Sequence, residues 1–372
     1  MKHTPLDSAT LSQAAQRALG PGPGRMMAAR GMMPLPPADQ VAVLYQLSLD
    51  PDVALASSAR ATASQLPEKL LLGTLVDPSL DARVLDFFAI LVASKPALFD
   101  AIALNPAVGD ETIADLAARC GAREVDQLAQ NEQRLLRHPE IIGAMYMNKH
   151  ARMSTVDRVV ELAVRNKIRV PGLAAWDEVA RALLQTATKQ PVTADDDAHF
   201  AALADKLTGD DSALTTGDAD QVIEETGEEL TLDDTEGQSI DKMSIPNKIR
   251  LATLGNAFAR GVLIRDPVRL VAVAAIKAPG VTEIEAARYA ANVTLPEDVI
   301  RYIASRRDWT KRYGVKVSLC RNPKASVPDV TRMLPFLRPK DLQKLAKSKG
   351  VSSAVVAQAM KLVTQRSGPG TK

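Results

Sequence analysis

The stretch CRNPKASVPDVTRML, residues 320–334, contains the pattern on which the fold prediction rests. Its asparagine, Asn322, precedes a proline and then Ser326, whose hydroxyl oxygen can accept hydrogen bonds from the free N–H groups at the start of a helix. Apolar residues then recur at helical intervals, as at Val330 and Leu334. The stretch therefore predicts a turn, a capped helix start and a short amphipathic helix.

Three further asparagines stand at the same point of the same pattern. Asn105, Asn148 and Asn292 are each followed within a few residues by a capping residue and then by an amphipathic helix. The interval from Asn105 to Asn148 is 43 residues, and that from Asn292 to Asn322 is 30. A repeat would therefore vary in length. Capped helices also follow turns in any all-helical protein, but we favour an internal repeat.

Two stretches near these asparagines fit the capping box, in which a Thr and a Glu three residues later bind each other's backbone N–H groups. They are Thr282-x-x-Glu285 and Thr294-x-x-Glu297. The pair Ser326-x-x-Asp329 is a shorter acidic variant. These signals predict where three of the helices begin.

Composition favours helices throughout the chain. Hydrophobic residues make up 46% of the 372 residues and aromatic residues only 3%, which suits helices packed through Ala, Leu, Val, Ile and Met better than β-sandwiches. Residues 314–319 alternate as a strand would, but they also fit a helix with Trp309, Tyr313 and Val317 on one stripe. The helix phases place six residues in the core: Val159, Leu162, Ile300, Ile303, Val330 and Leu334.

Charge is strongly segregated along the chain, although the net charge is only +2. Residues 1–190 carry 20 basic and 20 acidic side chains, residues 191–241 carry 16 acids and the single base Lys206, and residues 242–372 carry 25 bases and 8 acids. A segment at −15 thus precedes one at +17. The basic segment should attract polyanions, and the acidic one can compete for the same surface.

These shifts define five segments. We expect a disordered Pro/Gly-rich N-terminus over 1–38, a neutral helical-repeat domain over 39–190, an acidic linker over 191–241, a basic helical-repeat domain over 242–366 and a tail over 367–372. Short helices cannot bury an apolar face alone and must stack on neighbours. The predicted fold is therefore all-α, with α-solenoid-like helical repeats in two blocks joined by an acidic disordered linker.

The acidic linker leads to a hypothesis about regulation. Residues 195–236 are tethered next to the basic block, so they could dock on it transiently at high effective concentration and weaken its binding of any polyanion. The alternative is a solubilising spacer that never touches the basic block.

The Asn-Pro turns carry a family resemblance. Asn105-Pro106 and Asn322-Pro323, each followed by a capped helix, resemble the turns of bacterial leucine-rich-repeat-variant and HEAT-like helical repeats. The resemblance is strongest over residues 242–366 and weaker over 39–190. It implies an α-solenoid that binds other macromolecules, and it assigns no functional residue.

The residues of common catalytic and metal sites are absent or badly spaced. Cys120 and Cys320 stand 200 residues apart, which excludes a disulfide framework and a four-cysteine zinc site. The histidines, at positions 3, 138, 150 and 199, lack metal-site spacing. We predict no enzyme, no cofactor and no metal. The N-terminus lacks a signal peptide and no apolar run could span a membrane, so we expect a cytoplasmic protein without membrane insertion.

A basic surface is the candidate binding site. Its first cluster is interleaved with aromatic side chains, which can stack on bases while cations hold phosphates, and its second lies on the next helix. The alternative is that the charges form an ordinary solvated face and that the aromatics pack inside, which we favour for the aromatics. The candidate residues are Arg301, Arg306, Arg307, Trp309, Lys311, Arg312, Lys316, Arg321, Lys324, Arg338, Lys340, Lys344 and Lys347.

Two functions fit this surface. The first is a non-enzymatic interaction scaffold or adaptor, in which helical repeats present a surface to protein partners. The second is a nucleic-acid-binding protein whose basic block contacts phosphates and whose acidic linker modulates it. We favour the scaffold, because no helix-turn-helix, RNA-recognition or zinc-finger signature is present.

Overall fold

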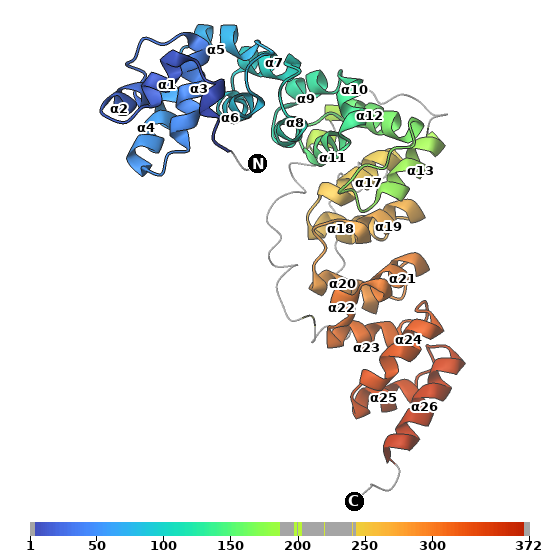
Figure 1. Cartoon of the computed structure of the whole chain (residues 1–372). Helices are drawn as coiled ribbons and strands as arrows, with labels where there is room; N and C mark the ends of the chain where they lie inside the picture. Colours follow the sequence, from blue (N-terminus) through green and yellow to red (C-terminus); the bar gives the residue numbers. More distant parts are fainter. Residues whose placement is uncertain are drawn as a thin grey trace, which may run out of the picture. The chain divides into compact units, whose positions relative to one another are not determined.

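The computed structural model describes residues 4–186 and 243–367, together with residues 197–198, 200–202, 219 and 240. Within these residues all regular secondary structure is helical, which confirms the all-α prediction (Figure 1). Residues 314–319 lie inside a helix, so the strand alternative is excluded there. The chain divides into two compact units, Met1–Gly172 and Leu173–Lys372.

Unit 1 is built from short helices that pack mainly on neighbours in the chain. Its helices α3 and α4 pack on each other, as do α5 and α7, α6 and α8, and α8 and α11. The helices are η1 (Ser8–Thr10), α1 (Gln13–Leu19), α2 (Gly24–Ala29), α3 (Pro37–Ser48), α4 (Val53–Ser64), α5 (Glu68–Leu75), α6 (Ala82–Val92), α7 (Pro96–Leu104), α8 (Asp110–Ala117), α9 (Ala122–Leu128), α10 (Glu132–Arg137), α11 (Glu140–Met147) and α12 (Met153–Arg165).

Unit 2 follows the same principle. Its helices α17 and α19, α20 and α23, and α25 and α26 form the closest pairs, and Figure 1 shows α17 to α26 following one another in chain order. The helices are α13 (Trp176–Thr186), α17 (Ile245–Leu254), α18 (Ala257–Leu263), α19 (Arg269–Lys277), α20 (Glu283–Ala291), α21 (Glu297–Ser305), α22 (Arg307–Thr310), α23 (Tyr313–Arg321), α24 (Val327–Met333), η2 (Leu334–Phe336), α25 (Pro339–Ala346) and α26 (Ser353–Ser367).

The N-terminal segment differs from its prediction of disorder. The Pro/Gly-rich stretch lies between helices, and α1 and α2 form on either side of it. The hydroxyl of Ser12 caps α1 by accepting the N–H of Ala15 at 3.1 Å. Ala15 and Ala18 are fully buried, because small side chains let α1 pack closely on α3. Tertiary packing thus overrides a composition that disfavours order.

The boundary at residue 190 is also different. The charge boundary places α13 in the first block, but this helix packs on α17 and α19 of unit 2. The buried carboxylate of Glu178 on α13 accepts two hydrogen bonds at 2.9 Å from the Lys277 ammonium group on α19. These two residues are 99 positions apart, so the local sequence pattern could not predict their ion pair.

Most of the acidic segment lies outside the described residues. The hypothesis that residues 195–236 dock on the basic block concerns these residues and stays a prediction. One described residue in it, Phe200, differs from the expectation of a solvated chain. Its side chain is 1% exposed, and the guanidinium carbon of Arg250 lies 4.8 Å from the centre of its ring. At this position, burial of the aromatic ring outweighs the hydrophilic character of the surrounding sequence.

The core predictions are confirmed with one exception. Val159, Ile300, Ile303, Val330 and Leu334 are all at most 2% exposed. Leu162 is only partly buried, so its place in the core was predicted wrongly. The helix phase is correct on α12, but Leu162 lies at the edge of its buried face.

The predicted helix starts are correct in two of three cases. Thr282 and Glu285 form the complete capping box of α20, and the Ser326 hydroxyl caps α24 by accepting the N–H of Asp329 at 3.3 Å. Thr294 does not cap α21, whose N-cap is Pro296. Its hydroxyl donates instead to Oδ1 of Asn292 at 2.7 Å.

The four repeated asparagines share one conformation and one position. Each is the C-cap of a helix, with φ between −72 and −80° and ψ between 113 and 121°, and each is buried. Each also accepts, through Oδ1, the N–H of the residue two positions later. They are Asn105, Asn148, Asn292 and Asn322.

Three of these asparagines bind the end of an earlier helix. Nδ2 of Asn322 donates to the carbonyl oxygens of Ala290 and Asn292 at 2.9 and 3.0 Å, where α20 ends. Asn105 and Asn148 each bind two carbonyls at the ends of α5 and α8 in the same way. The separation from asparagine to the first carbonyl is 30, 31 and 32 residues in the three cases. This bond is regular even though the distances between asparagines are not.

Replacing Asn322 with Ala should lower the free energy of unfolding by about 2–3 kcal/mol, because it leaves two buried carbonyls without a donor. Urea denaturation of the whole chain measures the change. Asn166→Ala is the matched control, since its Nδ2 makes one exposed bond, to the carbonyl of Leu162 at 2.9 Å. An equal loss in both variants would contradict a capping role for Asn322.

Candidate functional site

Every carboxylate of residues 242–372 is engaged in an ion pair. The eight acids lie among the described residues, and each has a basic nitrogen within 4.0 Å. They are Asp266, Glu283, Glu285, Glu297, Asp298, Asp308, Asp329 and Asp341. The excess positive charge of this segment therefore resides on basic side chains that these eight carboxylates do not neutralise.

Four of the candidate bases are neutralised in this way. Lys311 lies 3.1 Å from Asp308, and Arg321 lies 3.6 Å from Asp341. Arg301 pairs with Glu297, and Arg312 pairs with Glu283 at the start of α20. Exposed pairs of this kind contribute little to stability, but they reduce the charge that these residues offer to a partner.

Two further candidates bind main-chain oxygens. Lys316 Nζ donates to the carbonyl of Lys311 at 2.9 Å. Lys324 Nζ donates to the carbonyls of Thr294 and Leu295 at 2.8 and 2.7 Å, where it supports the turn that follows Asn292. The role of Lys324 is therefore structural.

The aromatic candidates pack inside, as favoured from the sequence. Trp309 is 8% exposed and stands edge to face with Tyr302, with ring centres 6.0 Å apart. The Arg306 guanidinium carbon lies 5.6 Å from the Trp309 ring centre. A buried ring cannot stack on a base.

Tyr313 is also occupied. Its hydroxyl donates to Oδ2 of Asp341 at 2.6 Å and accepts the backbone N–H of Arg338 at 2.9 Å. The guanidinium carbon of Arg338 lies 4.3 Å from the ring centre. This stacking fixes Arg338 at the start of α25 with its charge exposed.

Helix α25 presents the remaining candidates. Pro339 at the first position favours the helix start, and Leu342, Leu345 and Ala346 bury one face of it. Positions 340, 344 and 347 share the opposite face. We call Lys340, Lys344 and Lys347 the lysine face; all three are exposed and have no ion-pair partner among the described residues.

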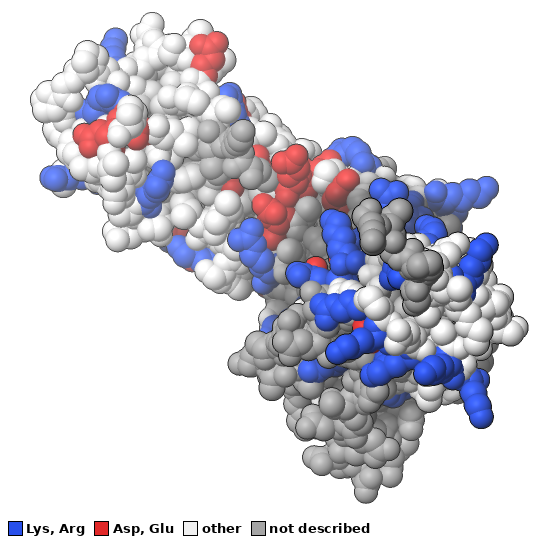
Figure 2. Space-filling view, turned by 90° about the horizontal axis from the view of Figure 1, so that it is seen from below, with Lys and Arg blue, Asp and Glu red and all other residues white. Residues whose placement is uncertain are grey.

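Figure 2 shows Lys and Arg gathered over unit 2 with few acidic side chains between them. Arg307 is another exposed candidate without an ion pair among the residues that the structure describes. Among the described residues, the structure thus reduces the thirteen candidates to a smaller set of cations without an ion pair, of which the lysine face and Arg338 belong to one helix and its two caps.

Sequence reasoning missed Phe336. It lies in η2 directly before α25, its side chain is 67% exposed, and the Lys316 ammonium group is 5.8 Å from its ring centre. Its position between Pro335 and Pro339, outside any helix stripe, was the available signal. It is a large exposed aromatic ring a few residues before α25 in the chain.

The thiols offer no nucleophile at neutral pH. Cys120 and Cys320 are free and buried, and burial raises the pKa of each to about 12. A thiol reacts mainly as its thiolate, which is scarce at neutral pH for such a pKa.

The described part of the chain contains no candidate membrane span and no candidate metal site. None of its helices is long and apolar enough to cross a bilayer. It also contains no cluster of three or more His, Cys, Asp or Glu side chains arranged to hold a metal ion. No protein-family model, curated protein or solved structure matches this chain.

Proposed function

We propose that this chain is a non-enzymatic scaffold of stacked helical repeats, whose unit 2 binds an acidic segment of a partner protein through the lysine face and Arg338. One observation carries the proposal. Every acidic side chain of residues 242–372 is already paired, whereas the three residues of the lysine face, two on α25 and one at its C-cap, have no ion-pair partner among the residues that the structure describes. Unpaired cations held on one rigid helix supply a field that is complementary to an acidic chain.

The bound asparagines support the repeat architecture in this proposal. In a solenoid, each repeat contacts only its neighbours. The asparagines fit this arrangement, because each binds the carbonyls at the end of a helix 30–32 residues earlier. We infer that both units are α-solenoid-like. A rigid stack of this kind keeps the lysines of α25 in fixed relative positions.

The chemistry of the free cations favours an acidic protein segment. The lysine face consists of ammonium groups, which act as point charges, whereas most candidate arginines are paired or stacked. Arginine is the residue suited to bidentate phosphate recognition. Trp309 and Tyr313 are occupied within the unit and offer no free stacking surface.

Phe336 favours a second candidate function. An exposed ring beside Lys316 and close in sequence to Arg338 can stack on an unpaired base while the cations contact phosphates. Single-stranded nucleic acid is therefore the alternative partner class.

Replacing the lysine face by Lys340→Gln, Lys344→Gln and Lys347→Gln together should weaken binding of poly-L-glutamate about tenfold at low salt. Each exposed charge contributes about 0.5 kcal/mol, and 1.4 kcal/mol is tenfold. Fluorescence anisotropy on the full chain measures the affinity, which should fall further as salt is added. The charge-matched control replaces three exposed bases of unit 1, namely Arg17, Arg30 and Lys69, with Gln.

The same assay separates the two partner classes. Tighter binding of oligo-dT than of poly-L-glutamate, lost in Phe336→Ala, would establish the nucleic-acid function and overturn the scaffold proposal. Equal losses in the lysine-face variant and its control would show that net charge alone attracts the probe. Absence of binding to either probe would overturn both candidates.

A further inference from the structure

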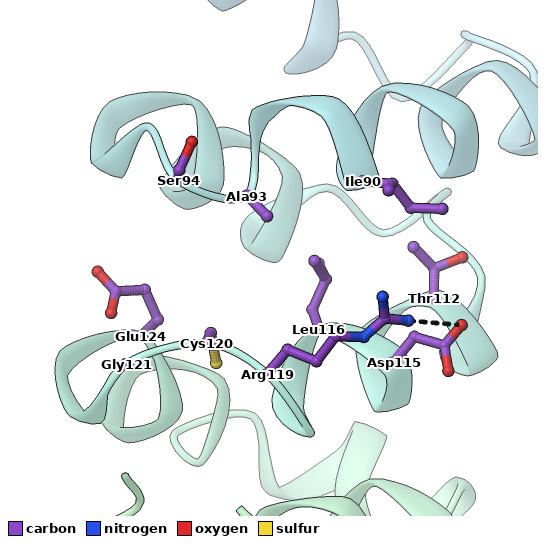
Figure 3. A pocket seen from close by; sticks show the side chains of 10 residues that line it. All are labelled: Ile90, Ala93, Ser94, Thr112, Asp115, Leu116, Arg119, Cys120, Gly121 and Glu124. Atoms are coloured by element: carbon purple, nitrogen blue, oxygen red, sulfur yellow. Dashed lines mark ion pairs between the residues drawn. The ribbon is translucent and has the colours of Figure 1, made fainter.

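A cavity of about 350 Å³ opens on unit 1, far along the chain from the lysine face (Figure 3). It lies between α6 and α8 and extends to the turn that leads into α9. Its lining residues are Ile90, Ala93, Ser94, Thr112, Asp115, Leu116, Arg119, Cys120, Gly121 and Glu124. A volume of this size is at the lower end for ligand sites.

The walls contributed by α6 and Leu116 are apolar, and the Arg119 side chain runs below them toward Asp115 (Figure 3). In Figure 3, Leu116 points from α8 toward α6, which carries Ile90 and ends beside Ala93. Ile90 is 51% exposed although its side chain is large and apolar. Covering this wall would remove apolar surface from water, which favours an apolar side chain as the occupant.

The ends of the cavity are acidic. Glu124 lies at one end, and Asp115 with Thr112 lies at the other (Figure 3). A Cβ atom on residue 121 would come within 2.9 Å of Glu124 Oε2, so Gly121 leaves room for the carboxylate at the rim. Thr112 in turn donates to Oδ1 of Asp86 at 2.6 Å.

Two guanidinium groups only partly balance these acids. Arg119 lies 3.8 Å from Asp115, and both side chains are more than half exposed. Arg123 bridges Asp100 at 2.9 Å and Glu124 at 3.3 Å. Together with Asp86, the lining and its direct partners therefore hold four carboxylates against two guanidinium groups. Exposed pairs of this kind exchange partners at little cost.

We propose that this cavity binds a peptide segment of a partner protein in which a large apolar side chain stands next to a lysine or arginine. The apolar side chain fills the space between Ile90, Ala93 and Leu116, and its basic neighbour pairs with Glu124 or Asp115. The site is independent of the lysine face and opposite to it in charge preference. The chain would then hold two partners of different chemistry, one on each unit.

A peptide library displayed on phage and selected on the full chain tests the proposal. Each round includes counter-selection on Ala93→Phe, whose ring fills the cavity, so that peptides bound elsewhere are removed. We expect the enriched peptides to carry an apolar residue beside Lys or Arg. The Ala93→Phe variant keeps its lysine face and still binds acidic peptides. Counter-selection therefore removes those peptides, and the two sites remain distinguishable.

Variants at the rim test the binding mode with a synthetic enriched peptide. Ile90→Ser should weaken binding about tenfold, and Glu124→Gln should abolish the preference for the basic peptide over its neutral analogue. The matched control is Val76→Ser, because Val76 is 52% exposed on the same unit but does not line the cavity. Its affinity should equal that of the wild type.

The proposal is overturned if no peptide is enriched, if the enriched peptides lack the apolar-basic pair, or if they bind Ala93→Phe equally.

Discussion

Replacing Glu285 with Ala is expected to lower the free energy of unfolding of unit 2 by about 3–5 kcal/mol, the usual loss when one partner of a buried ion pair is removed. Glu285 accepts hydrogen bonds from Nε and Nη2 of Arg260 at 2.9 and 3.0 Å, and both side chains are almost fully buried. The substitution leaves the Arg260 charge without its counter-ion. It also removes the capping box with Thr282 and the acceptor for the Tyr289 hydroxyl.

Urea denaturation followed by circular dichroism measures this loss. Glu297→Ala is the control, since Glu297 pairs with Arg301 four residues later and both side chains are more than half exposed. That variant should change stability by less than about 0.5 kcal/mol. The double variant Arg260→Met with Glu285→Leu should recover part of the loss, because apolar residues can replace a buried pair. A single variant as stable as the control would contradict the buried pair.

Replacing Ile303 with Ala is expected to cost about 2–5 kcal/mol, the range for a large apolar side chain deleted from a packed core. Ile303 is fully buried on α21, and Ala304 beside it is also buried. The lost methyl and methylene groups leave a cavity that the surrounding packed helices close only in part. Chemical denaturation of the full chain measures the loss.

Val293→Ala is the comparison within the same unit. Val293 is apolar but 51% exposed, so its truncation should cost well under 1 kcal/mol. A loss below about 0.5 kcal/mol for Ile303→Ala, within the range of a surface substitution, would show that the buried face of α21 is assigned wrongly.

The local features of the fold could be predicted from the sequence. Helix content, the buried face of α21 and the caps at Thr282 and Ser326 all depend on residues within a few positions of one another. The N-terminal helices and the position of α13 could not be predicted, because they depend on packing against distant segments. Leu162 combines the two cases. Its helix was predicted correctly, but the burial of its side chain depends on what packs beside α12.

The candidate site shows the same limit. The basic residues of the first cluster look equally available in the sequence, but Arg312 is neutralised by Glu283 from 29 residues away and Lys324 binds a turn 30 residues earlier. The lysine face was among the predicted residues, yet nothing in the sequence separated it from the neutralised ones. Phe336 was missed because it belongs to no helix stripe.

The asparagine bonds also determine how such a chain can change its length. Asn322 closes the end of α20 and is itself followed by a new turn, so each such residue serves the repeat before it and starts the one after it. A tandem duplication of residues 293–322 would supply one more asparagine together with the carbonyls of Cys320 and Asn322 for it to bind. Growth by whole repeats therefore leaves no buried donor or acceptor unmatched, whereas an insertion between an asparagine and its carbonyls separates the two.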